Sequence, residues 1–377
     1  MPPEKHALLS ASSSYRWLNC TPSARLSEMF EDTGSAYALE GSDAHLLCEA
    51  RLKQALGIPI EDPVENLTYY DQEMEESALA YRDYVLELLN QAKTMCSDPQ
   101  VFIEQRLDFS NWVEGGFGTS DCCIVADGTM FVIDMKYGRG IPVLADSNPQ
   151  MMLYSLGLLN LFDFLYDIRE ISMNIFQPRL SNVSEYTISV TDLLDWAENT
   201  LKPAAELAFK GLGEFHCGEW CQFCKAKYEC RERAEANLAL AKYEFAQPPL
   251  LSDEEIETIL TQADEFAAWI SDIRDYAFKQ ALAGKVWNGF KLVAGRSVRK
   301  YTDDATVATV VTNAGYDPYE RKLMGITEMT KMLGKGRFEE LLGSLVFKPP
   351  GKPTLVAASD KRPALNIEDA KNDFDEI

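Results

Sequence analysis

The pattern of apolar and polar residues changes repeatedly between helical and strand spacing along the first two thirds of this 377-residue chain. Apolar residues recurring every three to four positions predict amphipathic helices, whereas strict alternation predicts strands with one buried face. In the first predicted helix, Tyr15 and Leu18 turn inward, with Trp17 as a third candidate. The predicted helices are Ser10–Arg25, Tyr37–Glu49 and Glu73–Ala92, and the predicted strands are Val101–Phe109, Glu170–Pro178 and Glu185–Val190.

A hairpin signal occupies the middle of this series. Asp127-Gly128 joins two short runs rich in Val, Ile, Phe and Thr, and such a dipeptide favours a two-residue turn. If these residues form the turn, Asp121 lies opposite Asp134, and Lys136 projects from the same face as Asp134. The opposite face is predicted to be buried, and it carries Cys122, Ile124, Ala126, Phe131, Ile133 and Met135.

Two carboxylates on opposed strand positions repel each other unless a cation lies between them. Asp121 and Asp134 are therefore candidate metal ligands, and the alternative is an exposed acidic hairpin without a site. The next segment supports a site, because Asn148-Pro149 opens an apolar helix on which Gln150 and Tyr154 share one face.

Asp, then Asp-x-Lys on a hairpin, then Gln-x-x-x-Tyr on the following helix resembles the RecB-like branch of the PD-(D/E)XK nucleases. Asp134 replaces the usual Glu of the triplet, and no Pro precedes Asp121. The resemblance implies a restriction-endonuclease-like α/β core, with a mixed central sheet between helices. It also implies catalytic roles for Asp121, Asp134, Lys136, Gln150 and Tyr154.

Members of this branch carry Gly-x-x-x-His on the helix before the catalytic sheet, and Gly41 to His45 matches that spacing. By resemblance, His45 joins Asp121 and Asp134 as a ligand of Mg²⁺ or Mn²⁺. From its residue type alone, a single helical His is more often structural. Glu104 precedes the hairpin, and we expect it to be a salt-bridged surface residue rather than part of the site.

Four cysteines within fourteen residues form a second candidate site, and thiolates at this density suit zinc or an iron–sulfur cluster. One arrangement is a local zinc site that includes Cys217. The other arrangement, Cys221-x2-Cys224-x5-Cys230, resembles the iron-staple nucleases of the AddB-type and CRISPR-associated RecB-like groups. That resemblance implies a [4Fe–4S] cluster with Cys20 as its distant fourth ligand, and it leaves Cys217 spare.

The net charge of −23 repels phosphate at long range, so contact with DNA requires local basic groups and bound metal ions. The chain has no apolar run long enough to span a membrane, and its start lacks the apolar core of a signal peptide. We therefore expect a cytoplasmic protein of a bacterial or phage-infected cell, without a membrane partner.

The C-terminal third has a different, mainly helical character. Ser252 to Leu282 is a strongly helical run with a capping box, and Trp287–Gly295 is predicted to be a strand that ends in Arg296, Arg299 and Lys300. Short helices are predicted at 304–313 and 327–345. We expect a nuclease core with its cluster at 1–240, an accessory domain at 241–347 and an extended tail at 348–377.

The function implied by the resemblance is metal-dependent hydrolysis of DNA, by an exonuclease that acts on DNA ends in phage recombination or repair. The whole chain also resembles a phage and prophage family. A phage single-strand annealing or DNA-binding protein, or a second copy of the chain, is a candidate partner. The alternatives are a non-catalytic DNA-end-binding or partner-binding scaffold, and a zinc-stabilised adaptor.

Overall fold

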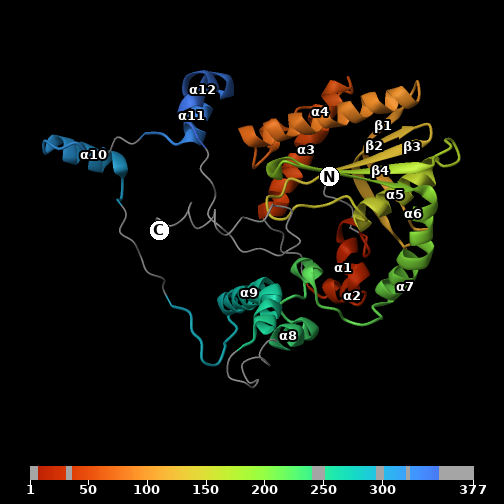
Figure 1. The fold of residues 1–377 in the computed structure, drawn as a ribbon. Helices are drawn as coiled ribbons and strands as arrows, with labels where there is room; N and C mark the ends of the chain where they lie inside the picture. Colours follow the sequence, from red (N-terminus) through yellow and green to blue (C-terminus); the bar gives the residue numbers. More distant parts are fainter. Residues whose placement is uncertain (1–6, 31–35, 240–250, 294–300, 320–322, 348–377) are drawn as a thin grey trace. The chain divides into compact units, whose positions relative to one another are not determined.

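The computed structural model describes residues 7–30, 36–239, 251–293, 301–319 and 323–347 (Figure 1). The chain divides into two compact units, Met1–Phe278 and Lys279–Ile377, and all the candidate site residues belong to the first unit. Among the described helices, none is long and apolar enough to cross a membrane.

The first unit is built on one five-stranded mixed sheet, as predicted. The strands lie in the order β1-β2-β3-β4-β5, and β3 and β4 are parallel while all other neighbours are antiparallel. Ala126 pairs with Thr129 and Cys122 with Ile133, which confirms the predicted hairpin register. The strands are β1 Gln100–Asp108, β2 Phe117–Ala126, β3 Thr129–Met135, β4 Glu170–Gln177 and β5 Asn182–Ser189.

Helices cover both faces of this sheet (Figure 1). The apolar hairpin face predicted to be buried packs against α3 (Ala36–Ala55) and α4 (Gln72–Met95). The opposite face of the hairpin is also buried, because its alternate residues pack with those of α5 (Pro149–Phe162). Alternate side chains of β2 and β3 therefore lie in two different apolar cores, one on each face of the sheet, and neither face is exposed to solvent.

The N-terminal segment differs from the single helix that its pattern predicts. It forms a short 3-10 turn at Ala11–Ser13, then α1 (Ser14–Asn19) and α2 (Ser23–Glu28). The break falls at Cys20 to Pro22, because Cys20 leaves the helical conformation and proline starts helices more readily than it continues them. Leu18 packs against the core as predicted, and Trp17 is fully buried.

The predicted inward direction of Tyr15 is wrong, because its side chain is 42% exposed and its ring packs edge-on against Trp220. Ser189 caps α6 (Val190–Trp196) by accepting a hydrogen bond from the Asp192 amide. The chain continues through a π-helical turn at Ala197–Leu201, α7 (Lys202–Lys210) and a 3-10 turn at Glu219–Phe223.

Two helices end the first unit, α8 (Arg231–Leu238) and α9 (Asp253–Leu282). The predicted capping box is present at the start of α9, where the Ser252 amide donates to Glu255 and the Glu255 amide donates to Ser252 Oγ. Short 3-10 turns also lie at Val64–Asn66 and Pro178–Leu180.

In the second unit, α10 (Asp304–Asn313) has the predicted bounds. The helix predicted at 327–345 is instead α11 (Ile326–Leu333), α12 (Lys335–Leu342) and a 3-10 turn at Gly343–Leu345, because Gly334 adopts a positive φ of 75°. The predicted strand is wrong over its described residues, 287–293, which form no strand. Arg296, Arg299, Lys300 and the tail from residue 348 lie outside the described residues.

Candidate metal centre

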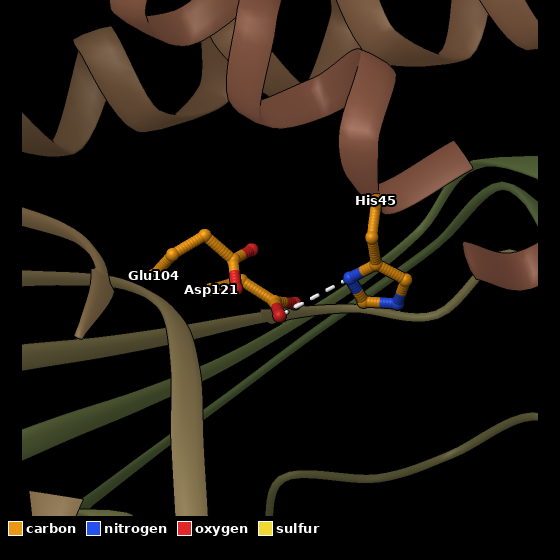
Figure 2. Close-up of side chains that lie close together, drawn as sticks. All are labelled: His45, Glu104 and Asp121. Carbon is orange, nitrogen blue, oxygen red and sulfur yellow. Dashed lines mark ion pairs between the residues drawn. The ribbon is translucent and has the colours of Figure 1, made fainter. Parts of the chain in front are cut away.

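Three chain segments bring one imidazole and two carboxylates together at one end of the sheet (Figure 2). His45 lies on α3, Glu104 on β1 and Asp121 on β2. His45 Nδ1 lies 3.1 Å from Asp121 Oδ1, and the donor atoms of all three side chains lie within 4.8 Å of one another. The His45 side chain is 34% exposed, so the group remains open on one side.

Glu104 is exposed, as predicted, but its carboxylate belongs to the donor group, which corrects the prediction that it is not part of the site. The pairs Ile103–Cys122 and Gln105–Ser120 place Glu104 directly across from Asp121 in the β1–β2 register. Its φ of 51° interrupts the strand, and such a conformation is strained for a residue with a side chain. Glu104 therefore faces Asp121 and His45, and like-charge opposition at a strained position is typical of a functional site.

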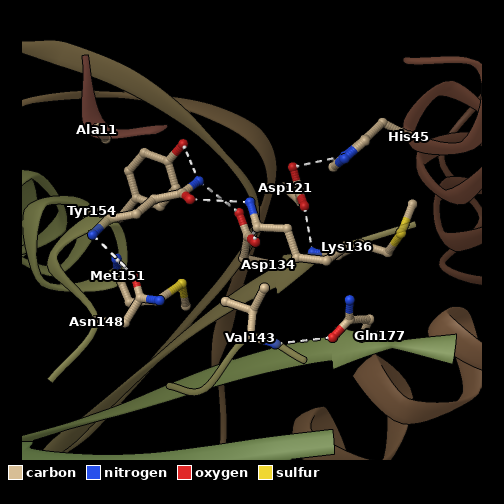
Figure 3. Close-up of polar contacts among 12 residues, drawn as sticks. Ala11, His45, Asp121, Asp134, Lys136, Val143, Asn148, Met151, Tyr154 and Gln177 are labelled. Atoms are coloured by element: carbon tan, nitrogen blue, oxygen red, sulfur yellow. Dashed lines mark hydrogen bonds and ion pairs between the residues drawn. The ribbon is translucent and has the colours of Figure 1, made fainter. Parts of the chain in front are cut away.

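A second polar group adjoins the first one and contains the other predicted residues (Figure 3). Lys136 Nζ lies 2.8 Å from Asp134 Oδ2 and donates to Gln150 Oε1 at 3.0 Å. Gln150 Nε2 donates to Asp134 Oδ1 and to the Tyr154 hydroxyl, each at 3.1 Å. Asp134 is only 2% exposed, so these contacts hold a carboxylate that is nearly excluded from water.

The hairpin and the start of α5 explain why these side chains meet. Asn148 caps α5 by accepting hydrogen bonds from the Gln150 and Met151 amides, and Pro149 is tolerated in the first turn. Gln150 and Tyr154 then lie on one helical face, as their spacing predicts. The Met135 amide donates to Asp121 Oδ2 at 2.6 Å, and this bond connects the two polar groups through the hairpin backbone.

The charges within the site alter its protonation equilibria. Burial lowers the pKa of His45, but the adjacent Asp121 carboxylate, with a smaller effect of Asp134, raises that pKa to about 9. Partial burial of its carboxylate and the charge of Asp121 raise the pKa of Glu104 to about 7. Burial lowers the pKa of Lys136, but Asp134 outweighs this effect and raises it, so the ammonium stays charged.

The pKa values of Asp121 and Asp134 are shifted in opposite directions. Burial raises the pKa of Asp121, but His45 and the Met135 amide outweigh it, so that this pKa is lowered and the carboxylate stays ionised. Burial and the charge of Asp121 raise the pKa of Asp134. The structure therefore groups two predicted ligands, His45 and Asp121, with Glu104. The third predicted ligand, Asp134, is paired with Lys136.

The second predicted cluster also converges in space. Cys20, Cys221, Cys224 and Cys230 line one pocket, although Cys20 is remote from the others in sequence. Cys217 is not among the residues that line this pocket. Three cations, Arg16, Lys227 and Arg233, also line it. All these cysteines are free thiols.

The spacing of these thiols bears on the choice between zinc and a cluster. A tetrahedral zinc site with Zn–S bonds of about 2.3 Å places its sulfur atoms about 3.8 Å apart. Among the described residues, only His45, Glu104 and Asp121 form a group of three His, Cys, Asp or Glu donors within 4.8 Å. No three of the pocket thiols lie within 4.8 Å of one another, and the Cys217 thiol, which does not line the pocket, shares a hydrogen bond with Cys221.

Comparison with known proteins identifies one family. The sequence model described as "Protein of unknown function (DUF2800)" matches residues 6–363. A solved structure titled "Crystal structure of SSO0001" matches 49% of this chain and 94% of its own chain, with 16% sequence identity and a TM-score of 0.22. That TM-score is too low to support any argument about this protein.

Proposed function

We propose that this chain, which belongs to the DUF2800 family, is a metal-dependent DNA nuclease of the PD-(D/E)XK type. One observation carries the proposal. The donor group of His45, Glu104 and Asp121 adjoins a buried Asp134–Lys136 pair, and the Asp121–Met135 hydrogen bond connects them. A structural ion pair would not need a strained, like-charged neighbour such as Glu104 beside it.

The donor set fits a divalent cation. Two carboxylates and one imidazole suit Mg²⁺ or Mn²⁺, and sulfur donors are absent from this group. Bound there, such an ion supplies Lewis acidity toward a phosphate oxygen and lowers the pKa of a coordinated water. His45, Glu104 and Asp121 would hold the ion, and Asp134 would join them when its pairing with Lys136 loosens.

Lys136 supports this chemistry as a cation. Its ammonium stays protonated beside Asp134, so it can donate hydrogen bonds to a phosphate but cannot accept a proton. Fixed donors aimed at developing negative charge stabilise the transition state without reorganisation. We therefore assign Lys136 to charge stabilisation and to orientation of the attacking water, rather than to general-base catalysis.

Gln150 and Tyr154 act as positioning residues in this proposal. The Gln150 amide contacts Asp134, Lys136 and Tyr154 at once, so it fixes the orientation of all three side chains. Burial and the Asp134 charge raise the pKa of Tyr154, so its hydroxyl keeps its proton and can donate to the substrate strand. Neither residue belongs to the donor group that would hold the ion.

For the cysteine pocket we propose a [4Fe–4S] cluster held by Cys20, Cys221, Cys224 and Cys230. The spacing of the thiols, no three of which lie within 4.8 Å of one another, supports a cluster over a single zinc ion. Such a group supplies structural cross-linking here, because Cys20 belongs to the N-terminal segment and the other three follow the sheet.

The resemblance of the motifs further suggests an exonuclease that acts on DNA ends in phage recombination or repair, in the cytoplasm. Incubation of labelled DNA with the purified chain and Mn²⁺ tests the central proposal. We expect degradation that EDTA abolishes. DNA binding without any degradation would instead support the non-catalytic scaffold.

A further inference from the structure

Gln177, at the end of β4, lies beside the strand that carries Asp134 and Lys136. The Lys136 amide donates to the Phe176 carbonyl at 2.9 Å, so Gln177 is the next residue after this contact. Its side chain is 2% exposed, and a buried amide must satisfy all its hydrogen-bonding groups within the protein. The hydrogen-bond partners of the Gln177 side chain indicate its role.

The Gln177 amide binds the loop that connects Lys136 to the α5 helix (Figure 3). Its Nε2 donates to the carbonyls of Gly138 and Ile141, at 3.1 and 3.0 Å. Its Oε1 accepts from the Val143 amide and from Asn182 Nδ2, each at 3.1 Å. One side chain thus holds both the outgoing and the returning arm of the loop.

Neighbouring side chains continue this attachment toward α5. Asn182 Nδ2 donates to the Val143 carbonyl at 2.9 Å, and the Ala145 amide donates to Ser184 Oγ at 2.9 Å. The loop has no regular structure, so these strand side chains satisfy backbone groups that would otherwise need water. The start of α5, and therefore Gln150, is fixed relative to β3 by these contacts.

We propose that Gln177 is a positioning residue of the nuclease site, which acts by holding Gln150 within hydrogen-bond reach of Lys136 and Asp134. This inference rests on the proposed function, and it adds a residue outside the motifs that suggested that function. Displacement of a positioning group by about 1 Å can reduce turnover about 100-fold. The contact network predicts a loss of turnover with little change in the binding of metal or DNA.

The test compares Gln177→Glu and Gln177→Met with Asn174→Ala. Glu keeps the size but removes both donors and places an oxygen against the Gly138 and Ile141 carbonyls, and Met removes all polar contacts. Asn174 is an equally buried amide of β4 that contacts Tyr84 and Ser172 instead of the loop. Both Gln177 variants should lose turnover by roughly 10- to 100-fold at unchanged KM and Mn²⁺ affinity, whereas Asn174→Ala should lose only thermal stability.

Coupling to Gln150 distinguishes positioning from general destabilisation. In a Gln150→Ala background, Gln177→Glu should cause no further loss of turnover, because the residue through which it acts is already gone. Losses that multiply in the double variant would overturn the proposal, and so would turnover that falls equally in Asn174→Ala.

A second readout does not depend on activity. Amide hydrogen exchange over residues 138–151 should accelerate in both Gln177 variants and not in Asn174→Ala. Unchanged exchange would overturn the positioning role, whatever the enzyme does. If the wild-type protein degrades no DNA but this exchange pattern is found, the nuclease proposal fails, while the structural role of Gln177 in fixing Gln150 stands.

Discussion

Glu104 shows most clearly how the surroundings of a single residue indicate a functional site. Its carboxylate opposes Asp121 across two strands, and in the metal-free protein this opposition is unfavourable. We predict that Glu104→Gln raises the stability of the metal-free protein by roughly 0.5–1 kcal/mol, because it removes one of two opposed charges. The same change should weaken Mn²⁺ binding by at least about tenfold, since affinity depends on the number of charged ligands.

Thermal melts without metal, and calorimetric titration with Mn²⁺, measure both effects. Glu170→Gln is a matched control, because it removes an exposed strand carboxylate at the Thr129 end of the sheet. Equal behaviour of the two variants would remove Glu104 from the proposed ligand set.

The pKa of His45 gives a second prediction at this scale. Because it is raised to about 9, a proton on His45 stabilises the metal-free protein below pH 6.5. This contribution is lost as the pH rises through 9. A bound cation needs the neutral imidazole, so binding of Mn²⁺ at pH 8 should release about one proton.

Calorimetry in two buffers of different ionisation enthalpy measures the number of protons released. The His45→Ala variant should bind Mn²⁺ more weakly, and its binding should release almost no protons. Release of no proton by the wild-type protein would show that His45 is not a ligand.

At the scale of elements, turns and helix starts could be predicted from neighbouring residues, whereas contacts between distant segments could not. The hairpin register followed from Asp127-Gly128, and the start of α5 followed from Asn148-Pro149, because both depend on neighbouring residues. The place of Glu104 in the donor group was not predicted, since it depends on pairing with β2 and on a positive φ that no adjacent residue signals. The outward direction of Tyr15 accompanies a ring contact with Trp220, a residue far along the chain that local apolar spacing cannot indicate.

The α8–α9 contact gives a prediction at this scale. Arg233 of α8 is 1% exposed and pairs with Glu265 and Asp272 of α9, at 2.8 and 2.7 Å. A chain ending at residue 240, the predicted core boundary, would lose both carboxylate partners of Arg233 and the stacking of Tyr276 on Tyr228. We predict that residues 1–240 give little soluble protein, whereas residues 1–282 fold.

Soluble yield and melting temperature are the measurements. Arg233→Met within the longer chain should lower its melting temperature, because it leaves the Glu265 and Asp272 carboxylates without their cation. A 1–240 chain as stable as the longer one would show that α9 contributes nothing to the core.

At the scale of the whole molecule, the cysteine pocket brings Cys20, near the start of the chain, together with three cysteines that follow the sheet. A cluster on Cys20 and Cys221 would close a loop of about 200 residues, and the entropy lost on closure grows with loop length. Ligation and folding should therefore be coupled. We predict a brown protein with broad absorption near about 400 nm, as expected for iron–thiolate ligation.

Cys20→Ala should lose this colour and much of its solubility, whereas Cys217→Ala should keep both, because Cys217 does not line the pocket. Absorption spectra and iron analysis of the two variants distinguish an iron–sulfur cluster from a zinc site. A colourless protein that contains zinc, and that requires Cys217 but not Cys20, would contradict the long-range arrangement and favour a local zinc site.

In the proposed function, the donor group of His45, Glu104 and Asp121 acts together with the Asp134–Lys136 pair to hydrolyse DNA. The most direct measurement is the Mn²⁺-dependent degradation of end-labelled single- and double-stranded DNA by the wild-type chain and by Lys136→Ala. Lys136 lies outside the donor group, so this variant should bind Mn²⁺ normally. We expect rapid degradation by the wild type, none with EDTA, and a loss of at least about 100-fold in Lys136→Ala. Equal degradation by both proteins, or none by the wild type with Mn²⁺ bound, would contradict the proposed function.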